Sequence, residues 1–286
     1  MRPSIRTLAP ALLVAASALT SLLPTPALAT NRKLTMFGLT ADQHLIRFRE
    51  DRARSNKDLG PITNLSNDVT LVGIDFRPAN GVLYAVGNAG GIYTLDLETA
   101  EATFRSQITL NGAPLTLTGT SFGVDFNPTV DRLRLVGDDG QNLRINVDTG
   151  AAIVDGGLNF PGTPPAPNTP ALGVTGVGYT NNDADAGTGT TLFDIDSQND
   201  QVVIQLPPNA GALTLTGKLG VDTAADLGFD VFSEIEDGST ESVRAFATLT
   251  TDASRLYEID LLTGKVDQRG RFRTSQQVIG LAITLD

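Results

Sequence analysis

The chain has 286 residues, with no cysteine, no tryptophan and a single histidine, His44. The lack of cysteine excludes disulfides, cysteine-bound zinc and iron–sulfur clusters, and one histidine excludes metal sites built from several imidazoles. The net charge of −11 argues against nucleic acid or an anionic membrane as a partner, because both bind basic patches.

Residues 1–29 have the pattern of a secretory signal peptide. A basic start with Arg2 and Arg6 precedes an apolar stretch and a cleavage motif that ends at Ala29. The alternative is a retained anchor, but a membrane span needs roughly 20 apolar residues, and Pro10 interrupts this stretch. We therefore expect cleavage after Ala29, export to the periplasm or the exterior, and no membrane span in residues 30–286.

A short pattern that begins with glycine recurs five times along the chain. Successive glycines are 50, 53, 52 and 52 residues apart, and a steady period in this range is typical of repeat architectures. The five segments are Gly73–Phe76, Gly123–Phe126, Gly176–Tyr179, Gly228–Val231 and Gly280–Ile283.

The residues after each glycine predict three further strands. A turn and an alternating apolar segment such as 82–86 come first, and a second turn leads to a third strand such as 92–96. The third strand ends in a turn of one type, seen at 96–100, 146–150 and 260–264, and a fourth strand follows. A four-stranded antiparallel unit of about 50 residues without helical periodicity is a β-propeller blade.

The two ends of the repeat region complement each other. Residues 34–39 and 45–48 match the second and third strands of a blade, whereas 280–286 form a first strand with nothing after it. We therefore predict a single five-bladed β-propeller over 30–286, with four-stranded antiparallel blades, one of them composite and made by the N- and C-terminal segments. The Pro-rich stretch 161–170 is predicted to be an insert within it. A β-sandwich or a solenoid of five coils is the alternative.

Several longer runs resemble an uncharacterised bacterial family known as domain of unknown function 4394. The resemblance covers residues 33–286, and it implies an exported, propeller-like module without an established activity or functional residues. The runs that carry it are Gly73–Pro78, Leu83–Gly87, Gly178–Asp183, Gly189–Asp196 and Leu206–Gly211.

Asp75, Asp125 and Asp230 each stand two residues after a repeat glycine, where the other two units have Gly178 and Ala282. The predicted innermost strands bring these acids near the axis. They could accept structural hydrogen bonds, bind a ligand or an ion, or act as the acid and base of a hydrolase.

An oxygen-rich loop at 181–187 is a second candidate site. Asn181, Asp183 and Asp185 alternate before a glycine, which is a pattern that suits calcium. An ordinary solvated turn is the alternative. No other cofactor is expected.

These features favour an exported, monomeric binding module for a small-molecule, glycan or protein ligand, rather than an enzyme. One alternative is a metal-assisted or acid/base hydrolase of glycans or phosphoesters that uses the three aspartates. Another is a structural component of the envelope or matrix. His44 lies in a turn and is expected to bond locally or face solvent.

Overall fold

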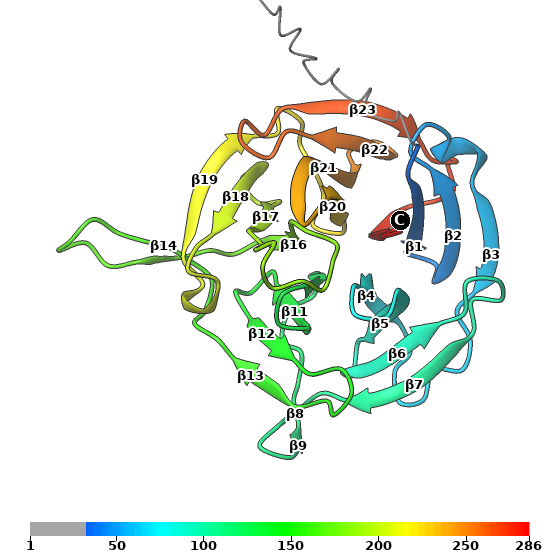
Figure 1. Cartoon of the computed structure of the whole chain (residues 1–286), viewed down its shortest axis with the longest axis horizontal. Coiled ribbons are helices and arrows are strands. Elements are labelled where there is room, and N and C mark those ends of the chain that lie inside the picture. Colours follow the sequence, from blue (N-terminus) through cyan, green and yellow to red (C-terminus); the bar gives the residue numbers. More distant parts are fainter. Residues whose placement is uncertain (1–32, 286) are drawn as a thin grey trace, which may run out of the picture. The chain divides into compact units, whose positions relative to one another are not determined.

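Five four-stranded antiparallel sheets form the bulk of residues 33–285, the part of the chain that the computed structural model describes. The sheets are arranged around a common axis, and the first strand of each sheet lies innermost (Figure 1). The predicted five-bladed β-propeller is therefore confirmed. The predicted signal peptide lies outside the described residues.

Blade 1 is composite, and blades 2 and 3 follow it in the chain. From the axis outward, blade 1 consists of β24 (Val278–Ile283), β1 (Thr35–Thr40), β2 (His44–Arg49) and β3 (Lys57–Pro61). Blade 2 consists of β4 (Leu71–Arg77), β5 (Val82–Gly87), β6 (Gly91–Leu95) and β7 (Ala102–Gln107). Blade 3 consists of β10 (Phe122–Asn127), β11 (Arg132–Gly137), β12 (Asn142–Ile145) and β13 (Ala152–Val154).

Blades 4 and 5 complete the ring. Blade 4 consists of β16 (Val174–Tyr179), β17 (Leu192–Asp196), β18 (Gln201–Gln205) and β19 (Leu213–Lys218). Blade 5 consists of β20 (Gly228–Glu236), β21 (Ser239–Thr250), β22 (Ser254–Ile259) and β23 (Val266–Arg271).

Short elements decorate this ring. The Pro-rich stretch spans the loop and second strand of a hairpin formed by β14 (Asn159–Phe160) and β15 (Thr169–Pro170), which projects from the ring (Figure 1). A second hairpin joins β8 (Thr109–Leu110) to β9 (Ala113–Pro114), and two single-turn helices are η1 (Ala53–Ser55) and η2 (Pro208–Ala210). In residues 33–285 no helix is long and apolar enough to cross a membrane.

The two ends of the described chain pair in blade 1, as the sequence predicts. β24 runs antiparallel to β1, with Ile283 opposite Met36 and Leu281 opposite Gly38. This pairing closes the ring, and it covers the edges that β24 and β1 would otherwise leave unpaired.

The repeat glycine is explained by the close approach of neighbouring inner strands. A Cβ atom on Gly123 would lie 2.8 Å from the backbone nitrogen of Val177, and one on Gly228 would lie 2.5 Å from that of Leu281. Real Cβ atoms do not approach backbone this closely, so any other residue would push the two blades apart near the axis.

The apolar core lies in layers between neighbouring blades. Tyr84 of blade 2 packs edge-on against Phe126 of blade 3, with ring centroids 5.4 Å apart. Phe193 of blade 4 belongs to one cluster with Phe229 and Ala245 of blade 5. Each blade is therefore stabilised mainly by its neighbours.

Candidate functional site

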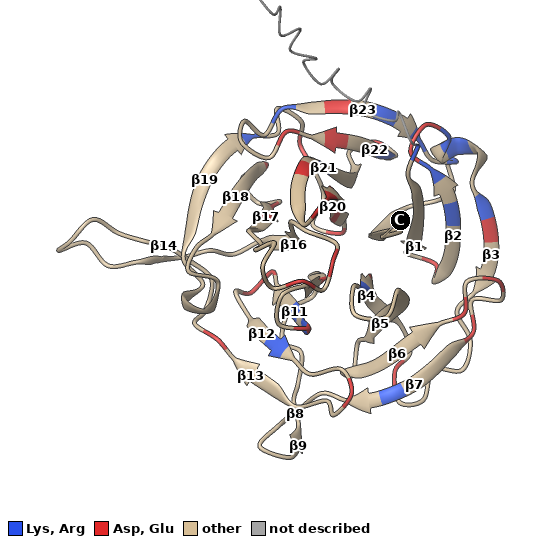
Figure 2. Cartoon of the chain, in the orientation of Figure 1, with Lys and Arg blue, Asp and Glu red and all other residues tan. Residues whose placement is uncertain are grey.

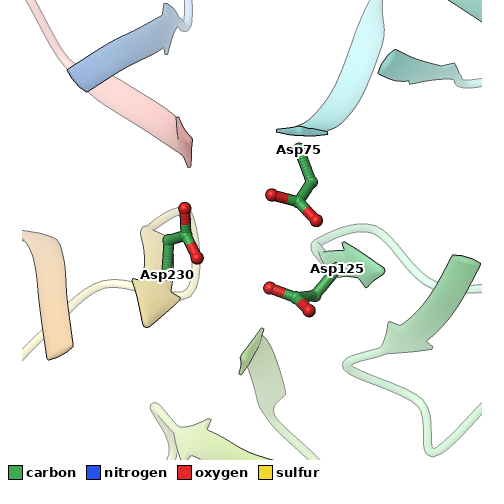
Figure 3. Close-up of side chains that lie close together, drawn as sticks. All are labelled: Asp75, Asp125 and Asp230. Carbon is green, nitrogen blue, oxygen red and sulfur yellow. The ribbon is translucent and has the colours of Figure 1, made fainter. Parts of the chain in front are cut away.

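The structure brings the three repeated aspartates together at the axis. Asp75 lies on β4, Asp125 on β10 and Asp230 on β20, and their carboxylates point toward one another (Figure 3). One oxygen of each lies within 4.8 Å of an oxygen of the other two. Their exposed fractions are only 4–6%.

Each of these carboxylates accepts a hydrogen bond from a backbone N–H of a neighbouring blade. The donor always stands three residues after the repeat glycine of its own blade. This is the position directly after the one that the three aspartates occupy in their blades. The pairs are Phe126 to Asp75 at 2.7 Å, Tyr179 to Asp125 at 3.2 Å and Ile283 to Asp230 at 2.6 Å. The aspartates therefore join inner strands, which is the structural role considered from the sequence.

The three aspartates are not equivalent. Asp75 also accepts the N–H of Phe76 at 2.7 Å, and Asp230 also accepts that of Val231 at 2.5 Å. Asp125 accepts a single backbone hydrogen bond. The other two thus use both carboxylate oxygens as acceptors.

Burial raises the pKa of all three carboxyls above the usual range, and for Asp75 and Asp125 repulsion within the group adds to it. The pKa of Asp230 rises to about 7. Among the described residues, no lysine or arginine lines the space around them. Protons or a bound cation must therefore offset their charge at neutral pH, because unpaired buried charge is strongly disfavoured.

The space beside the carboxylates limits their chemistry. It is about 20 Å³ and is also lined by Asn181 and Asn182. A cavity of this size holds about one water molecule. It can also hold a small ion, for which the carboxylates are suitable oxygen ligands. It has no room for a sugar ring or a phosphoester.

The 181–187 loop forms successive turns in which side chains bind the loop's own backbone. The Oδ1 atoms of Asn181 and Asp183 accept the N–H groups of Asp183 and Asp185, and Asp185 Oδ1 accepts that of Gly187. Thr188 donates to Asp183 Oδ2 at 3.0 Å. Self-contained Asx turns of this kind need no ion to hold their shape.

We therefore expect millimolar calcium to change the melting temperature by less than about 1 °C, since ion binding to the native state alone would raise it by more. Differential scanning fluorimetry with calcium, magnesium or chelator tests this. A rise of several degrees that Asp183→Asn removes and the exposed control Asp237→Asn keeps would instead assign a calcium site to the loop.

His44 has a local role, one of the two possibilities considered from the sequence. Its Nδ1 lies 3.0 Å from Asp58 Oδ1 across the β2–β3 pair. Neither residue contacts the axial aspartates.

A groove of about 750 Å³, which was not predicted from the sequence, opens between blades 4 and 5. Its apolar lining includes Phe193 of blade 4 and Val243, Ile259 and Leu262 of blade 5. Leu262 is 73% exposed and Val243 is 42% exposed. Sites for small ligands are mostly apolar and occupy about 300–1,000 Å³, so the groove has the size and lining of a binding site.

The residues that line the groove also include five charged ones, all of them from blade 5. They are Arg244, Glu258, Asp260, Lys265 and Asp267. Arg244 and Glu258 pair with each other, and Arg244 also pairs with Glu50.

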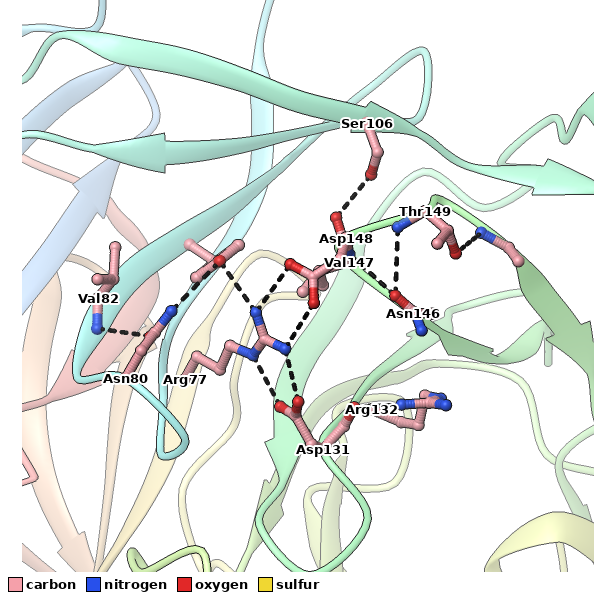
Figure 4. A network of polar contacts seen from close by, with 12 residues as sticks. Arg77, Asn80, Val82, Ser106, Asp131, Arg132, Asn146, Val147, Asp148 and Thr149 are labelled. Carbon is pink, nitrogen blue, oxygen red and sulfur yellow. Dashed lines mark hydrogen bonds and ion pairs between the residues drawn. The ribbon is translucent and has the colours of Figure 1, made fainter.

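The other four blade junctions are bridged by a basic side chain. Arg77 of blade 2 lies between Asp131 and Asp148 of blade 3 and bonds to both (Figure 4). The remaining bridges are Arg47 and Lys57 to Glu98, Arg134 to Asn209, and Arg244 to Glu50. Within residues 33–285, no ion pair joins blade 4 to blade 3 or to blade 5, and the junction with blade 5 also lacks a bridge of the Arg134–Asn209 kind.

Two residues explain the missing bridge. Blade 4 has Thr180 at the position where blade 2 has Arg77. Blade 5 has Leu262 at the turn position where blades 2 and 3 have Glu98 and Asp148. Strands β16 and β18 of blade 4 also contain no charged residue, in contrast to β2, β3, β22 and β23 (Figure 2). An exposed leucine where sister turns have acids was a signal available in the sequence.

A smaller hollow of about 240 Å³ lies at one mouth of the axis, where several inner strands begin. Its polar groups already have partners. Ser121 donates to Asp226 at 2.7 Å, and the amide of Gln43 bonds both the N–H and the C=O of Leu71. The groove is therefore the better candidate for a binding site.

The fold and these sites define a closed five-bladed propeller with a buried carboxylate cluster at its axis and an open groove between two blades. The chain belongs to the family described as Domain of unknown function (DUF4394), which matches residues 44–282. No curated protein matches the sequence.

Several solved structures share a distant likeness. A chain of a nidogen/laminin complex is 13% identical, with a TM-score of 0.48, and the match covers 89% of this chain and 99% of that one. A protein of unknown function from Bacteroides thetaiotaomicron is 13% identical, with a TM-score of 0.47, and the match covers 83% of this chain and 58% of that one.

Proposed function

We propose that this protein is a binding module and that its ligand occupies the groove between blades 4 and 5. The observation that carries the proposal is the groove itself, which is about 750 Å³ with an apolar lining, at the junction that has no bridging basic side chain among residues 33–285. The predicted signal peptide supports a role outside the cytoplasm, in the periplasm or beyond the cell.

The hydrolase alternative has less support from the geometry. Its candidate residues Asp75, Asp125 and Asp230 adjoin a space of only about 20 Å³. General acid–base catalysis requires the carboxyl groups to reach the bond that is broken. The structural alternative, an envelope or matrix component, does not account for an open apolar groove.

Methyl NMR on the leucine- and valine-labelled chain tests the proposal. Amphipathic peptides, oligosaccharides and aromatic fragments would be added in turn. We expect at least one class to shift the methyl signals of Val243, Leu262 and Val266, which line the groove. Leu262→Asp should weaken this binding at least about tenfold, since it places a charge against an apolar ligand surface.

The matched control is Val130→Asp, which changes an exposed valine on a turn of blade 3. This variant should bind like the parent chain. Shifts confined to other sites, such as Leu71 and Val72 at the axial mouth, or no shift with any class, would contradict the proposal.

A further inference from the structure

We propose that the occupant of the groove is an extended basic–apolar peptide segment that adds as a strand to the free edge of β21. This inference rests on the proposed function, and it names the class of ligand. Three features carry it: an unpaired strand edge, the position of that edge beside the groove, and the charge around it.

The edge arises because β21 is longer than its outer neighbour. β21 pairs with β20 as far as Ser239, but it pairs with β22 only from Ala245 onward. Residues 239–244 therefore have a partner on one side only, and no backbone hydrogen bond described for residues 33–285 occupies the other side. A free strand edge is a template for an added strand.

This free edge borders the groove. Val243 and Arg244 line it, and so does Ile259, where β22 ends. An added strand would therefore continue the line of β22 alongside β21.

Alternate side chains of such a strand would point toward blade 4. Val243 faces that side, because its partner Ser233 bonds to Asn181 and Asn182 of blade 4. Side chains on that face of the peptide would meet Val243, Phe193 and Leu262, so the peptide should be apolar at every second position.

The hairpin that presents the edge is acidic. Glu234, Glu236, Asp237 and Glu241 lie within residues 232–244, against one basic residue, Arg244, which already pairs with Glu50 and Glu258. An incoming strand with lysine or arginine between its apolar residues complements this charge.

The probe is a capped, fluorescently labelled octapeptide of alternating lysine and valine, titrated against the full chain by fluorescence anisotropy. We expect saturable binding that the Val243→Asp variant weakens at least about tenfold and the Val130→Asp control leaves unchanged. A peptide with glutamate in place of lysine should bind at least about tenfold more weakly.

N-methylation separates strand addition from simple docking. In an extended peptide the N–H groups of the valines point to one side and those of the lysines to the other. Methylating one set should abolish binding, whereas methylating the other set should leave the affinity within about twofold, because only one set can bond to β21.

The inference and the proposed function fail in different ways. If both methylated peptides bind like the parent peptide, or if the octapeptide does not bind while another ligand class shifts the groove methyls, strand addition is wrong and the binding module stands. If no ligand class occupies the groove, both are wrong.

Discussion

Removing residues 278–286 should leave the chain largely unfolded at temperatures where the full chain is folded. The deletion takes away β24, which is the innermost strand of blade 1 and the strand that closes the ring. It also removes the Ile283 N–H that binds Asp230. Both β1 and blade 5 lose a packing partner.

The expected loss is comparable to the whole stability of a domain. Val278, Leu281 and Ile283 are at most 3% exposed. Burying three such side chains contributes about 5–9 kcal/mol, whereas a typical domain is stable by about 5–15 kcal/mol. Circular dichroism and thermal melts of the truncated chain measure the effect.

A matched control replaces residues 161–168, the loop of the β14–β15 hairpin, with a short Asn-Gly turn. That change lies outside the blades and should shift the melting temperature by no more than about 2 °C. A peptide of residues 278–286 added in trans should partly restore the truncated chain. Truncated protein that melts like the full chain would rule out a ring closed by β24.

The sequence predicts this fold well because the repeat is imposed by backbone geometry. A glycine recurs on each inner strand, and at Gly123 and Gly228 the close approach of the neighbouring backbone leaves no room for a side chain. The turn that ends each third strand recurs for the same local reason. The composite blade follows from two incomplete units at the ends of the repeat.

The sites are harder to predict, because they depend on differences between blades. The shared position of Asp75, Asp125 and Asp230 indicates a place near the axis but not the partners of each carboxylate. The groove lies at the junction without a basic bridge. Thr180 and Leu262 stand there at positions where other units have the basic and acidic residues of a cross-blade ion pair. An absence of this kind becomes visible only when all five junctions are compared.

The axial aspartates should make the protein less stable as the pH rises through neutrality. Their pKa values are raised by burial, so the folded state holds protons that the unfolded state has already released. Their contribution is fully favourable below the unfolded pKa of about 3.9 and is lost as the pH rises through the folded pKa. For Asp230 that upper limit is about 7.

The size of this effect is measurable by urea denaturation. The rise in the pKa of Asp230 from 3.8 to about 7 alone corresponds to about 4 kcal/mol of stability, which is lost between these two pH values. We expect the free energy of unfolding to fall between about pH 5 and pH 8. At more acidic pH the trend should reverse, because carboxylates such as Asp148, whose pKa is held below its usual value by Arg77, lose their ion pairs.

Substitutions at two of the three positions should change stability in opposite directions at about pH 8. Asp75→Asn replaces one of two acceptor oxygens with an N–H₂ group that faces a backbone donor, so it should cost about 1–3 kcal/mol. Asp125→Asn can keep its single acceptor bond from Tyr179 while removing one charge from the cluster. It should therefore stabilise the protein and flatten its pH dependence.

The same experiment distinguishes protons from a bound cation at the axis. If a cation neutralises the carboxylates, stability should stay level between about pH 5 and pH 8 and fall when a chelator is added, and Asp125→Asn should destabilise by removing a ligand. If protons neutralise them, the chelator has no effect and Asp125→Asn gains stability over the parent as the pH rises. The cavity of about 20 Å³ and the single acceptor bond of Asp125 lead us to expect protons. Equal losses at Asp75 and Asp125, with no dependence on pH, would contradict this account of the axis.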